Sequence, residues 1–361
     1  MNSLRATLLS SRLAERGRVL ACLLVVAMAA MLSACGSAAS GKRAVAAPPV
    51  SNDAATVSAS TAAAESSQAS CGAAAPATLA RTAGLVAKQI YAHELSSSGV
   101  RADQRQVEGY EPLLSALAGG NRARVRQAVT TLVYSHTHIV RLRVMQGNAL
   151  QADVGGPYII APVGGQLRFH GRTVGHYVLS VQDDLGYVKL ERRYLDLPLV
   201  LQMGALRIPL EGTLAPGPAK IPELGPVTYR GTSYEAFSFD AAAFPQGTLR
   251  VSLLVPVPAS LPAESCTAIR LAELGRISKL TWDRFSLVSA PPSAYATELT
   301  TLTGGLTYVR SGAQQLAGST TPGPSHLPAS GTVKYRGTTW QVSSFSSAAA
   351  GAPVRVYLLV R

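Results

Sequence analysis

The sequence has little charge, few aromatic residues and few cysteines for its length. Of its 361 residues, 15% are charged, 6% are aromatic and 4 are cysteines, whereas 47% are hydrophobic. That hydrophobic share is enough to bury a core, which excludes a wholly disordered chain. No long hydrophobic run follows residue 35, which argues against a polytopic membrane protein. The length allows two domains, or one domain with a substantial appendage.

The short motifs that identify common enzyme classes are also missing. The sequence contains no HExxH, GxSxG or Walker A pattern, and no CxxC pair with the spacing of zinc ligands. We therefore expect no catalytic residues, no metal and no cofactor, and we do not expect an enzyme.

The N-terminal segment has the pattern of a secretory signal. Four arginines and one glutamate precede a short apolar stretch at residues 19–32. The stretch ends in Leu32-Ser33-Ala34-Cys35-Gly36, which resembles the lipobox of bacterial lipoproteins. The resemblance implies that residues 1–34 are a signal peptide and that Cys35 is lipidated, which anchors the chain to the extracytoplasmic side of the cell membrane. The alternative is an ordinary signal peptide or an uncleaved anchor, with Cys35 incidental.

Residues 35–70 form a low-complexity segment rich in Ala, Ser and Thr. Large apolar side chains are almost absent from it, so it cannot form a core of its own. This composition predicts a disordered tether that holds the folded part away from the membrane.

The chain is strongly basic. Lys and Arg total 33 against 20 Asp and Glu, which gives a formal charge of +13 and a pI near 9.9. A basic protein outside the cell would be attracted to anionic lipids, wall polymers or an envelope protein. We do not expect nucleic acid as a partner, because of export and because no Lys/Arg cluster is interleaved with aromatic residues. Diffuse surface charge with no dedicated partner is the alternative.

Two cysteines remain for the folded part. Cys22 lies in the signal and Cys35 in the lipobox, which leaves Cys71 and Cys266. Two cysteines in an exported chain predict a disulfide between them. Two separate buried thiols are the alternative.

The second half of the chain contains an internal repeat. Residues 215–239 and 321–345 align without a gap and are identical at 12 of 25 positions. Both segments contain Tyr-Arg-Gly-Thr, in which Arg-Gly predicts the tight turn of a hairpin. We infer a long first unit at residues 71–258 and a shortened second unit at residues 264–361, with a proline-rich junction between them.

Hydrophobic periodicity predicts an α+β fold. Helices are expected at 76–95 and 111–134, a hairpin at 140–154 and a strand at 173–182, with an irregular glycine-rich section between the hairpin and that strand. A short helix from Asp183 or Asp184 to Tyr194 follows, and then strands at 198–203, 205–210, 226–230, 233–239 and 249–256. The second unit is expected to begin with helices near 266–285 and 291–302 and to repeat the last five strands.

The order of these elements resembles the extracytoplasmic PAS-like sensor domains called Cache or PDC domains. The resemblance is carried by the hairpin at 140–154 and by residues 171–184, Gly-Arg-Thr-Val-Gly-His-Tyr-Val-Leu-Ser-Val-Gln-Asp-Asp. It implies N-terminal helices packed on an antiparallel sheet, with a small-molecule pocket over that sheet. The chain departs from the family in having no second membrane span and no kinase, cyclase or chemoreceptor segment. This departure favours a binding or accessory role, and no ligand is carried over.

Alternation along the strand at 173–182 places three polar side chains among valines on one face. This mixture suits a mostly apolar pocket with a few orienting polar groups. The candidate ligand-binding residues are Tyr158, His176, Ser180, Gln182 and Asp183. The alternative is that this face is polar because it is exposed to solvent.

The leading hypothesis is a lipid-anchored extracytoplasmic protein whose first unit binds a small ligand or a sensory partner. The shorter second unit is expected to brace the first. The alternative is a non-enzymatic envelope-interaction protein that uses a basic surface and has no small-molecule pocket.

Overall fold

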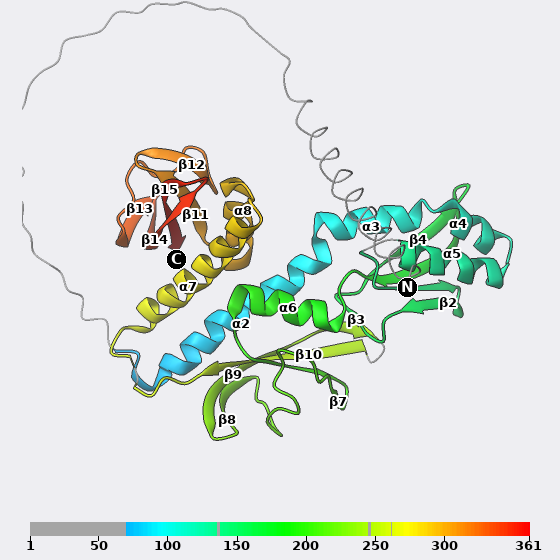
Figure 1. The fold of residues 1–361 in the computed structure, drawn as a ribbon, viewed down its shortest axis with the longest axis horizontal. Coiled ribbons are helices and arrows are strands. Elements are labelled where there is room, and N and C mark those ends of the chain that lie inside the picture. The colour runs from blue at the N-terminus through cyan, green and yellow to red at the C-terminus, as the bar shows by residue number, and fades with distance from the viewer. Residues whose placement is uncertain (1–69, 136–137, 245–246, 261) are drawn as a thin grey trace, which may run out of the picture. The chain divides into compact units, whose positions relative to one another are not determined.

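The computed structural model describes residues 70–135, 138–244, 247–260 and 262–361. The signal peptide predicted for residues 1–34, the lipidation site Cys35 and nearly all of the predicted tether lie outside these ranges and remain predictions. None of the helices in the described ranges combines the length and the apolar character needed to cross a membrane. The predicted α+β class is confirmed, with antiparallel sheets and helices packed on them (Figure 1).

A first repeat is built from two helices and one sheet. After a short 3-10 turn at Gly72–Ala74, its helices are α2 (Ala75–Ser96) and α6 (Asp184–Leu195). Its own strands are β6 (Leu199–Met203), β7 (Leu206–Arg207), β8 (Leu224–Tyr229), β9 (Thr232–Phe244) and β10 (Gly247–Pro256). They lie in the order β7-β6-β10-β9, with β8 also paired to β9, and β3 (Ile159–Ile160) adds to the same edge of β9 further along.

A second repeat has the same elements in the same order. Its helices are α7 (Cys266–Leu287) and α8 (Pro292–Thr303), and its strands are β11 (Leu306–Ser311), β12 (Gln314–Gly318), β13 (Ser330–Tyr335), β14 (Thr338–Ala349) and β15 (Ala352–Val360). The strand order β12-β11-β15-β14-β13 reproduces β7-β6-β10-β9-β8. Helices α2 and α7 have 22 residues each, and α6 and α8 have 12 each. The predicted repeat is thus confirmed, and it includes the helices.

The predicted hairpin turns are present in both repeats. Arg230-Gly231 and Arg336-Gly337 all have positive φ, at 50° and 79° in the first pair and 50° and 76° in the second. Positive φ at both central residues defines a type I′ turn, which matches the right-handed twist of the flanking strands. The turns therefore fix the same register for β8 against β9 and for β13 against β14.

An inserted module, residues 97–183, lies between α2 and α6. In the second repeat residues 288–291 take its place between α7 and α8. Its helices are α3 (Ser98–Glu108), α4 (Glu111–Ala118) and α5 (Arg122–Ser135), and its four-stranded sheet contains β2 (Ala149–Gly155), β1 (Arg141–Gln146), β5 (Arg172–Ser180) and β4 (Val163–Phe169), in that order. The strands of residues 71–258 therefore form two sheets, where the sequence predicted one.

Two local expectations inside the module differ from the structure. The helix expected at 111–134 is divided into α4 and α5 at Gly119-Gly120-Asn121, where Gly120 has a φ of 64°. The Asn121 side chain then accepts a hydrogen bond from the Arg124 N–H and so begins α5. The glycine-rich section expected to be irregular contains β4, because its glycines allow close approach to β5: a Cβ on Gly164 would lie 2.9 Å from the Tyr177 carbonyl oxygen.

The two repeats pack through their long helices. α2 contacts β9 on one side and α7 on the other, and α7 contacts β14 in turn (Figure 1). One hydrophobic core runs through both repeats, from Leu253 of β10 through Val86 and Ile277 to Val356 of β15. A disulfide joins Cys71, just before α2, to Cys266, the first residue of α7.

Glycines mark the closest approach of helix to sheet in both repeats. A Cβ on Gly84 of α2 would lie 2.0 Å from the Phe237 ring in β9, and a Cβ on Gly275 of α7 would lie 2.8 Å from the Ser343 hydroxyl in β14. These positions correspond in the two repeats, since α2 and α7 align residue by residue. Each long helix is therefore seated on its sheet in the same register.

Candidate functional site

His176 lies apart from the other candidate ligand residues. Its neighbours in β5, Tyr177 and Leu179, are buried in a core with α4 and α5, whereas His176 is exposed on the opposite face, as alternation predicts. There it lines an open depression of about 900 Å³ together with Gln146, Gln166, His170 and Arg172. Its role in ligand binding remains a prediction.

The other four candidates lie where the inserted module meets the first repeat. Ser180 is buried and donates a hydrogen bond to the Ile160 carbonyl. Gln182 donates to Glu94 of α2 at 2.8 Å, and Asp183 caps α6 by accepting from the Gly186 N–H. Tyr158 is half-buried against the core of the repeats. Gln182, Asp183 and Tyr158 make contacts with the repeat, and Ser180 holds β3 through Ile160. None of the four lines the depression beside His176.

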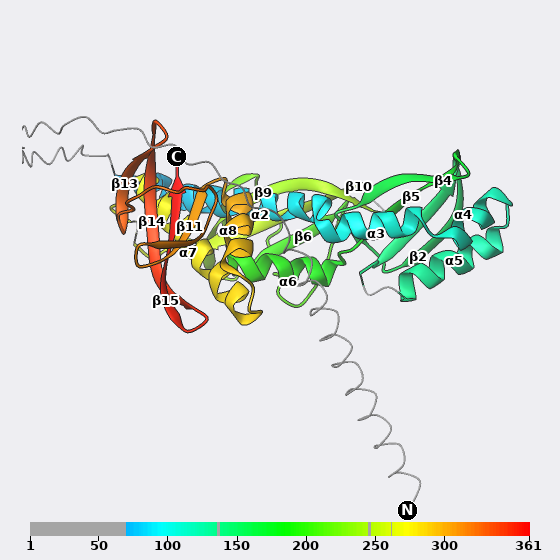
Figure 2. The same ribbon diagram turned by 90° about the horizontal axis from the view of Figure 1, so that it is seen from above.

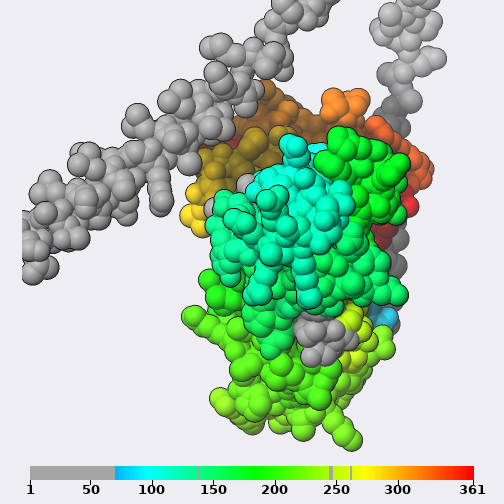
Figure 3. Space-filling model, turned by 90° about the vertical axis from the view of Figure 1, so that its right-hand side faces the viewer, coloured from blue at the N-terminus to red at the C-terminus, as the bar shows by residue number. Residues whose placement is uncertain are grey.

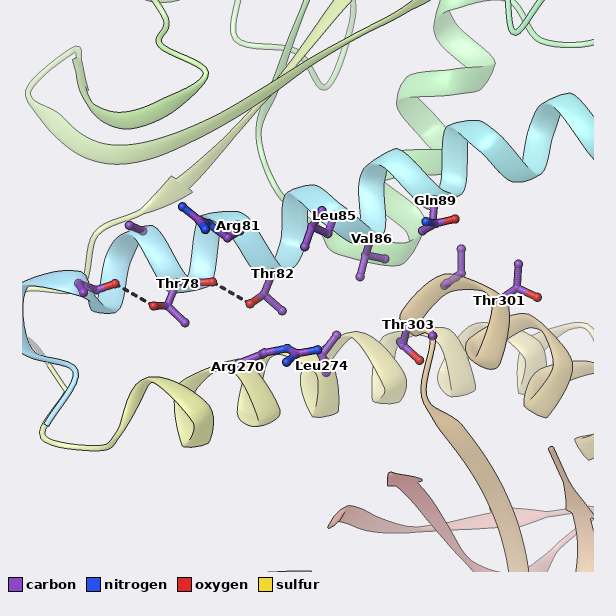
Figure 4. Close-up of a pocket in the computed structure, with 14 residues that line it drawn as sticks. Thr78, Arg81, Thr82, Leu85, Val86, Gln89, Arg270, Leu274, Thr301 and Thr303 are labelled. Carbon is purple, nitrogen blue, oxygen red and sulfur yellow. Dashed lines mark hydrogen bonds between the residues drawn. The ribbon is translucent and has the colours of Figure 1, made fainter. Parts of the chain in front are cut away.

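A groove runs between the two repeats. Its walls are α2, α7 and the end of α8, and its volume is about 690 Å³ (Figure 4). Its lining includes Arg81, Thr82, Leu85 and Val86 of α2, Arg270 and Leu274 of α7, and Leu302, Thr303 and Gly304 at the end of α8. Gly304 has a φ of 66° and ends α8, which lets the chain turn away beside α2. We call this cavity the inter-repeat groove.

The groove combines an apolar floor with two guanidinium groups. The floor is formed by side chains that are at most 3% exposed, namely Val86, Leu274 and Leu302. Arg81 is exposed, and the structure records no hydrogen bond or ion pair for it with any other described residue. Arg270 donates to the main-chain oxygen of Arg361 at 3.0 Å. This arrangement suits a small anion with an apolar portion, since a guanidinium binds a carboxylate through paired hydrogen bonds.

Threonine side chains on α2 add acceptors to the groove. Thr78 and Thr82 each donate to a carbonyl one turn earlier in their own helix, at 2.9 and 2.7 Å (Figure 4). Their oxygens retain the capacity to accept from a ligand. In Figure 4 Thr82 and Val86 point from α2 toward α7, the helix that carries Arg270.

The sequence did not reveal this groove. In the sequence, Arg81 and Arg270 have the pattern of solvent-facing residues on two amphipathic helices. Their spacing does not indicate that they line one groove. Their presence in the lining of one groove depends on the packing of α2 against α7, which hydrophobic periodicity within one helix does not specify. The available signal was the repeat itself, because two like helices with apolar faces are expected to pair.

A buried carboxyl group lies in α6, at the side of the core. The Glu191 side chain is 2% exposed and accepts a hydrogen bond from the Tyr187 hydroxyl at 2.6 Å. Its second oxygen has no partner among the described residues. Burial raises the pKa of Glu191, the Tyr187 hydrogen bond lowers it and the nearby Glu94 raises it, with a net pKa of about 8. Glu191 is therefore protonated in the folded protein at neutral pH.

Comparisons with known proteins assign no family. No family model matches the chain, and no curated protein matches it. Among solved structures, the chain is similar to the periplasmic domain of LuxQ from Vibrio cholerae, in one structure at 11% identity over 78% of this chain and 96% of that one, with a TM-score of 0.17. A second structure of that domain shows 9% identity, coverage of 79% and 97%, and a TM-score of 0.14.

A third similar structure is the ligand-binding domain of the amino acid chemoreceptor PctC from Pseudomonas aeruginosa PAO1, in complex with GABA. It shows 12% identity over 72% of this chain and 92% of that one, with a TM-score of 0.16. These TM-scores are too low to transfer a ligand or a residue role to this chain.

Proposed function

We propose that the chain is a lipid-anchored extracytoplasmic binding protein whose ligand occupies the inter-repeat groove. The observation that carries the proposal is the placement of Arg81 and Arg270 beside a floor of buried leucine and valine. The ligand class that fits is a small carboxylate with an apolar portion. The anchor rests on the lipobox-like segment ending at Cys35.

Binding is tested by thermal unfolding in the presence of a panel of carboxylates with apolar tails of increasing length. A ligand at about 100 times its Kd stabilises by about 2.7 kcal/mol, so the unfolding midpoint should rise by several degrees. Arg81→Gln should abolish the rise, because it removes a guanidinium that would bind the carboxylate. The variant should still fold, because Arg81 makes no hydrogen bond or ion pair with another described residue. Arg122→Gln, a control on α5, should leave the rise unchanged. A panel without any effect would refute the groove as the ligand site.

A second candidate function is adhesion to an anionic envelope surface. The inserted module carries Arg122, Arg124 and Arg126 in the first two turns of α5, and all three side chains are exposed (Figure 3 views the molecule from the side of α4 and α5). Cations at a helix N-terminus oppose the helix dipole, so this cluster costs stability and favours a functional role. Adhesion to wall material that is lost at high salt and reduced by Arg122→Gln/Arg126→Gln would support this candidate.

A further inference from the structure

The two repeats differ at one place on their sheets. In the first repeat the outer edge of β9 is covered twice, by β8 near its start and by β3 near its end, where Ile159 and Ile160 pair with Phe244 and Ala243. In the second repeat β13 covers β14 only as far as Ser343. No strand in the described part of the chain pairs with the same edge of β14 at residues 344–349.

The side chains around this edge correspond in the two repeats. Tyr91 of α2 and Tyr187 of α6 meet edge to face with ring centroids 5.4 Å apart. At the equivalent positions, Trp282 of α7 and Tyr295 of α8 meet edge to face at 4.8 Å. The aromatic pair that lies beside β3 in the first repeat is therefore reproduced in the second, where no described strand pairs with the equivalent edge.

Trp282 has lost the hydrogen bonds that its counterpart makes. The Tyr91 hydroxyl donates to the Ala242 carbonyl of β9 and accepts from the Ala161 N–H at 2.8 Å, just after β3. The Trp282 side chain is 4% exposed, and its indole N–H has no acceptor among the described residues. A buried donor without an acceptor is costly and rare in native proteins. An acceptor brought by an added strand would satisfy it.

The open edge offers main-chain groups and carries no charge. Because Arg336-Gly337 is a two-residue turn, the N–H groups of even-numbered residues in β14 point away from β15, and beyond Ser344 these are Ser346 and Ala348. Residues 344–349 read Ser-Phe-Ser-Ser-Ala-Ala, without the lysine or proline that protects exposed edges.

We propose that the outer edge of β14 at residues 344–349 is a docking site for an extended apolar segment of a partner protein. The segment adds to the second-repeat sheet as β3 adds to the first. Its chemistry is that of residues 155–165, Gly-Gly-Pro-Tyr-Ile-Ile-Ala-Pro-Val-Gly-Gly: uncharged, with two consecutive β-branched residues. The site does not depend on the inter-repeat groove.

The probe is a synthetic peptide of residues 155–165, added to the full chain. The first repeat is already occupied by its own β3, so the second repeat is the open site. The sequence has two tryptophans, and a Trp340→Phe variant assigns the two indole N–H signals by NMR. The Trp282 indole signal should move downfield on binding, and amide exchange at Ser346 and Ala348 should slow by at least about tenfold. A peptide with aspartates in place of both isoleucines should do neither.

Two substitutions in β14 distinguish the contribution of the main-chain N–H to binding from that of the side chain. Ala348→Pro removes an outward N–H at an edge, where proline is tolerated, and should weaken binding at least about tenfold. Ala348→Val keeps the N–H and should bind as the wild type does. An unchanged indole signal and unchanged exchange at millimolar peptide would overturn the proposal. Protection of Ser346 and Ala348 without peptide, in a protein that sediments as a dimer, would also overturn it by identifying a second copy as the occupant.

Discussion

Glu191 makes the stability of the folded chain depend on pH at the scale of one residue. Its carboxyl group is buried with one hydrogen bond, from Tyr187, and burial raises its pKa from 4.5 to about 8. Below pH 4.5 both the folded and the unfolded chain hold the proton. Between pH 4.5 and 8 only the folded chain holds it, so the free energy of unfolding falls as pH rises, by up to about 1.4 kcal/mol per pH unit. Above pH 8 the loss is complete.

Glu191→Gln should remove this component of the pH dependence. Urea unfolding at a series of pH values from 4.5 to 9 measures the slope for each protein. The variant should have a flatter profile than the wild type, because its side chain does not titrate. Glu211→Gln, which changes an exposed glutamate, should keep the wild-type profile. Parallel profiles for the wild type and Glu191→Gln would show that Glu191 is ionised in the folded protein.

At the scale of elements, the contact of each long helix with its sheet can be tested through its glycine. Gly→Ala inside a helix normally stabilises by about 1 kcal/mol. For Gly84→Ala the added methyl carbon would meet the Phe237 ring at 2.0 Å, so overpacking should prevail with a net loss of about 1–3 kcal/mol. For Gly275→Ala the nearest atom is the Ser343 hydroxyl oxygen, which rotates away, so the change should be close to neutral.

The second repeat supplies the rescue for Gly84→Ala. Ser343 occupies in β14 the position that Phe237 occupies in β9, so Phe237→Ser gives the first repeat the second repeat's contact. Denaturant unfolding of the two single variants and of Gly84→Ala/Phe237→Ser should reveal favourable coupling between the two changes. Strict additivity would mean that α2 does not approach β9 as closely as the structure shows.

The elements that the sequence predicts well are those specified by local pattern. Apolar spacing places α2 and α7 within one or two residues of their observed ends, and Asp183 caps α6 as expected. The gapless identity of residues 215–239 and 321–345 predicts that the second unit repeats the strands of the first, and the two sheets also share one strand order. The break at Gly119-Gly120 is hard to predict, because apolar residues continue at helical spacing on both sides of it.

What the sequence could not supply depends on packing between distant segments. No change in composition or pattern distinguishes the inserted module from the repeat around it. The sequence therefore predicts one unit at residues 71–258, where the structure has a repeat and an insertion. Gln182 joins the module to the repeat through Glu94, and Ser180 holds β3 through the Ile160 carbonyl. These reasons for their polarity become visible only in three dimensions. The strand pattern alone favoured a pocket.

At the scale of the whole molecule, the structure divides into two like repeats and an insertion. The first repeat reaches the module through the end of β9, which pairs with β3 (Figure 1), and β10 lies beside β9 (Figure 2). The second repeat shows that helix, short helix and five strands close on themselves with only residues 288–291 between the helices. The module is therefore expected to be dispensable for the fold of the repeats.

Replacing residues 97–183 with the sequence of residues 288–291, Val-Ser-Ala-Pro, tests this expectation. The shortened chain should keep the bond between Cys71 and Cys266 and unfold in one cooperative transition, because the core shared by α2, α7 and the two sheets remains. It should unfold at a lower temperature than the full chain, since the contacts of Ile160 and Ala161 are lost. A chain that aggregates or melts without cooperativity would show that the module is an integral part of the first repeat.

The shortened chain also allows the number of docking sites to be measured. Removing the module exposes the outer edge of β9 at Ala243 and Phe244, so the peptide of residues 155–165 should bind at two sites per chain, against one in the full chain. Isothermal titration gives the stoichiometry directly. One site in the shortened chain and none in the full chain would mean that only the first repeat accepts a strand. Two sites in the shortened chain and one in the full chain are expected if the repeats are equivalent at this edge and differ only in whether the chain's own β3 pairs with it.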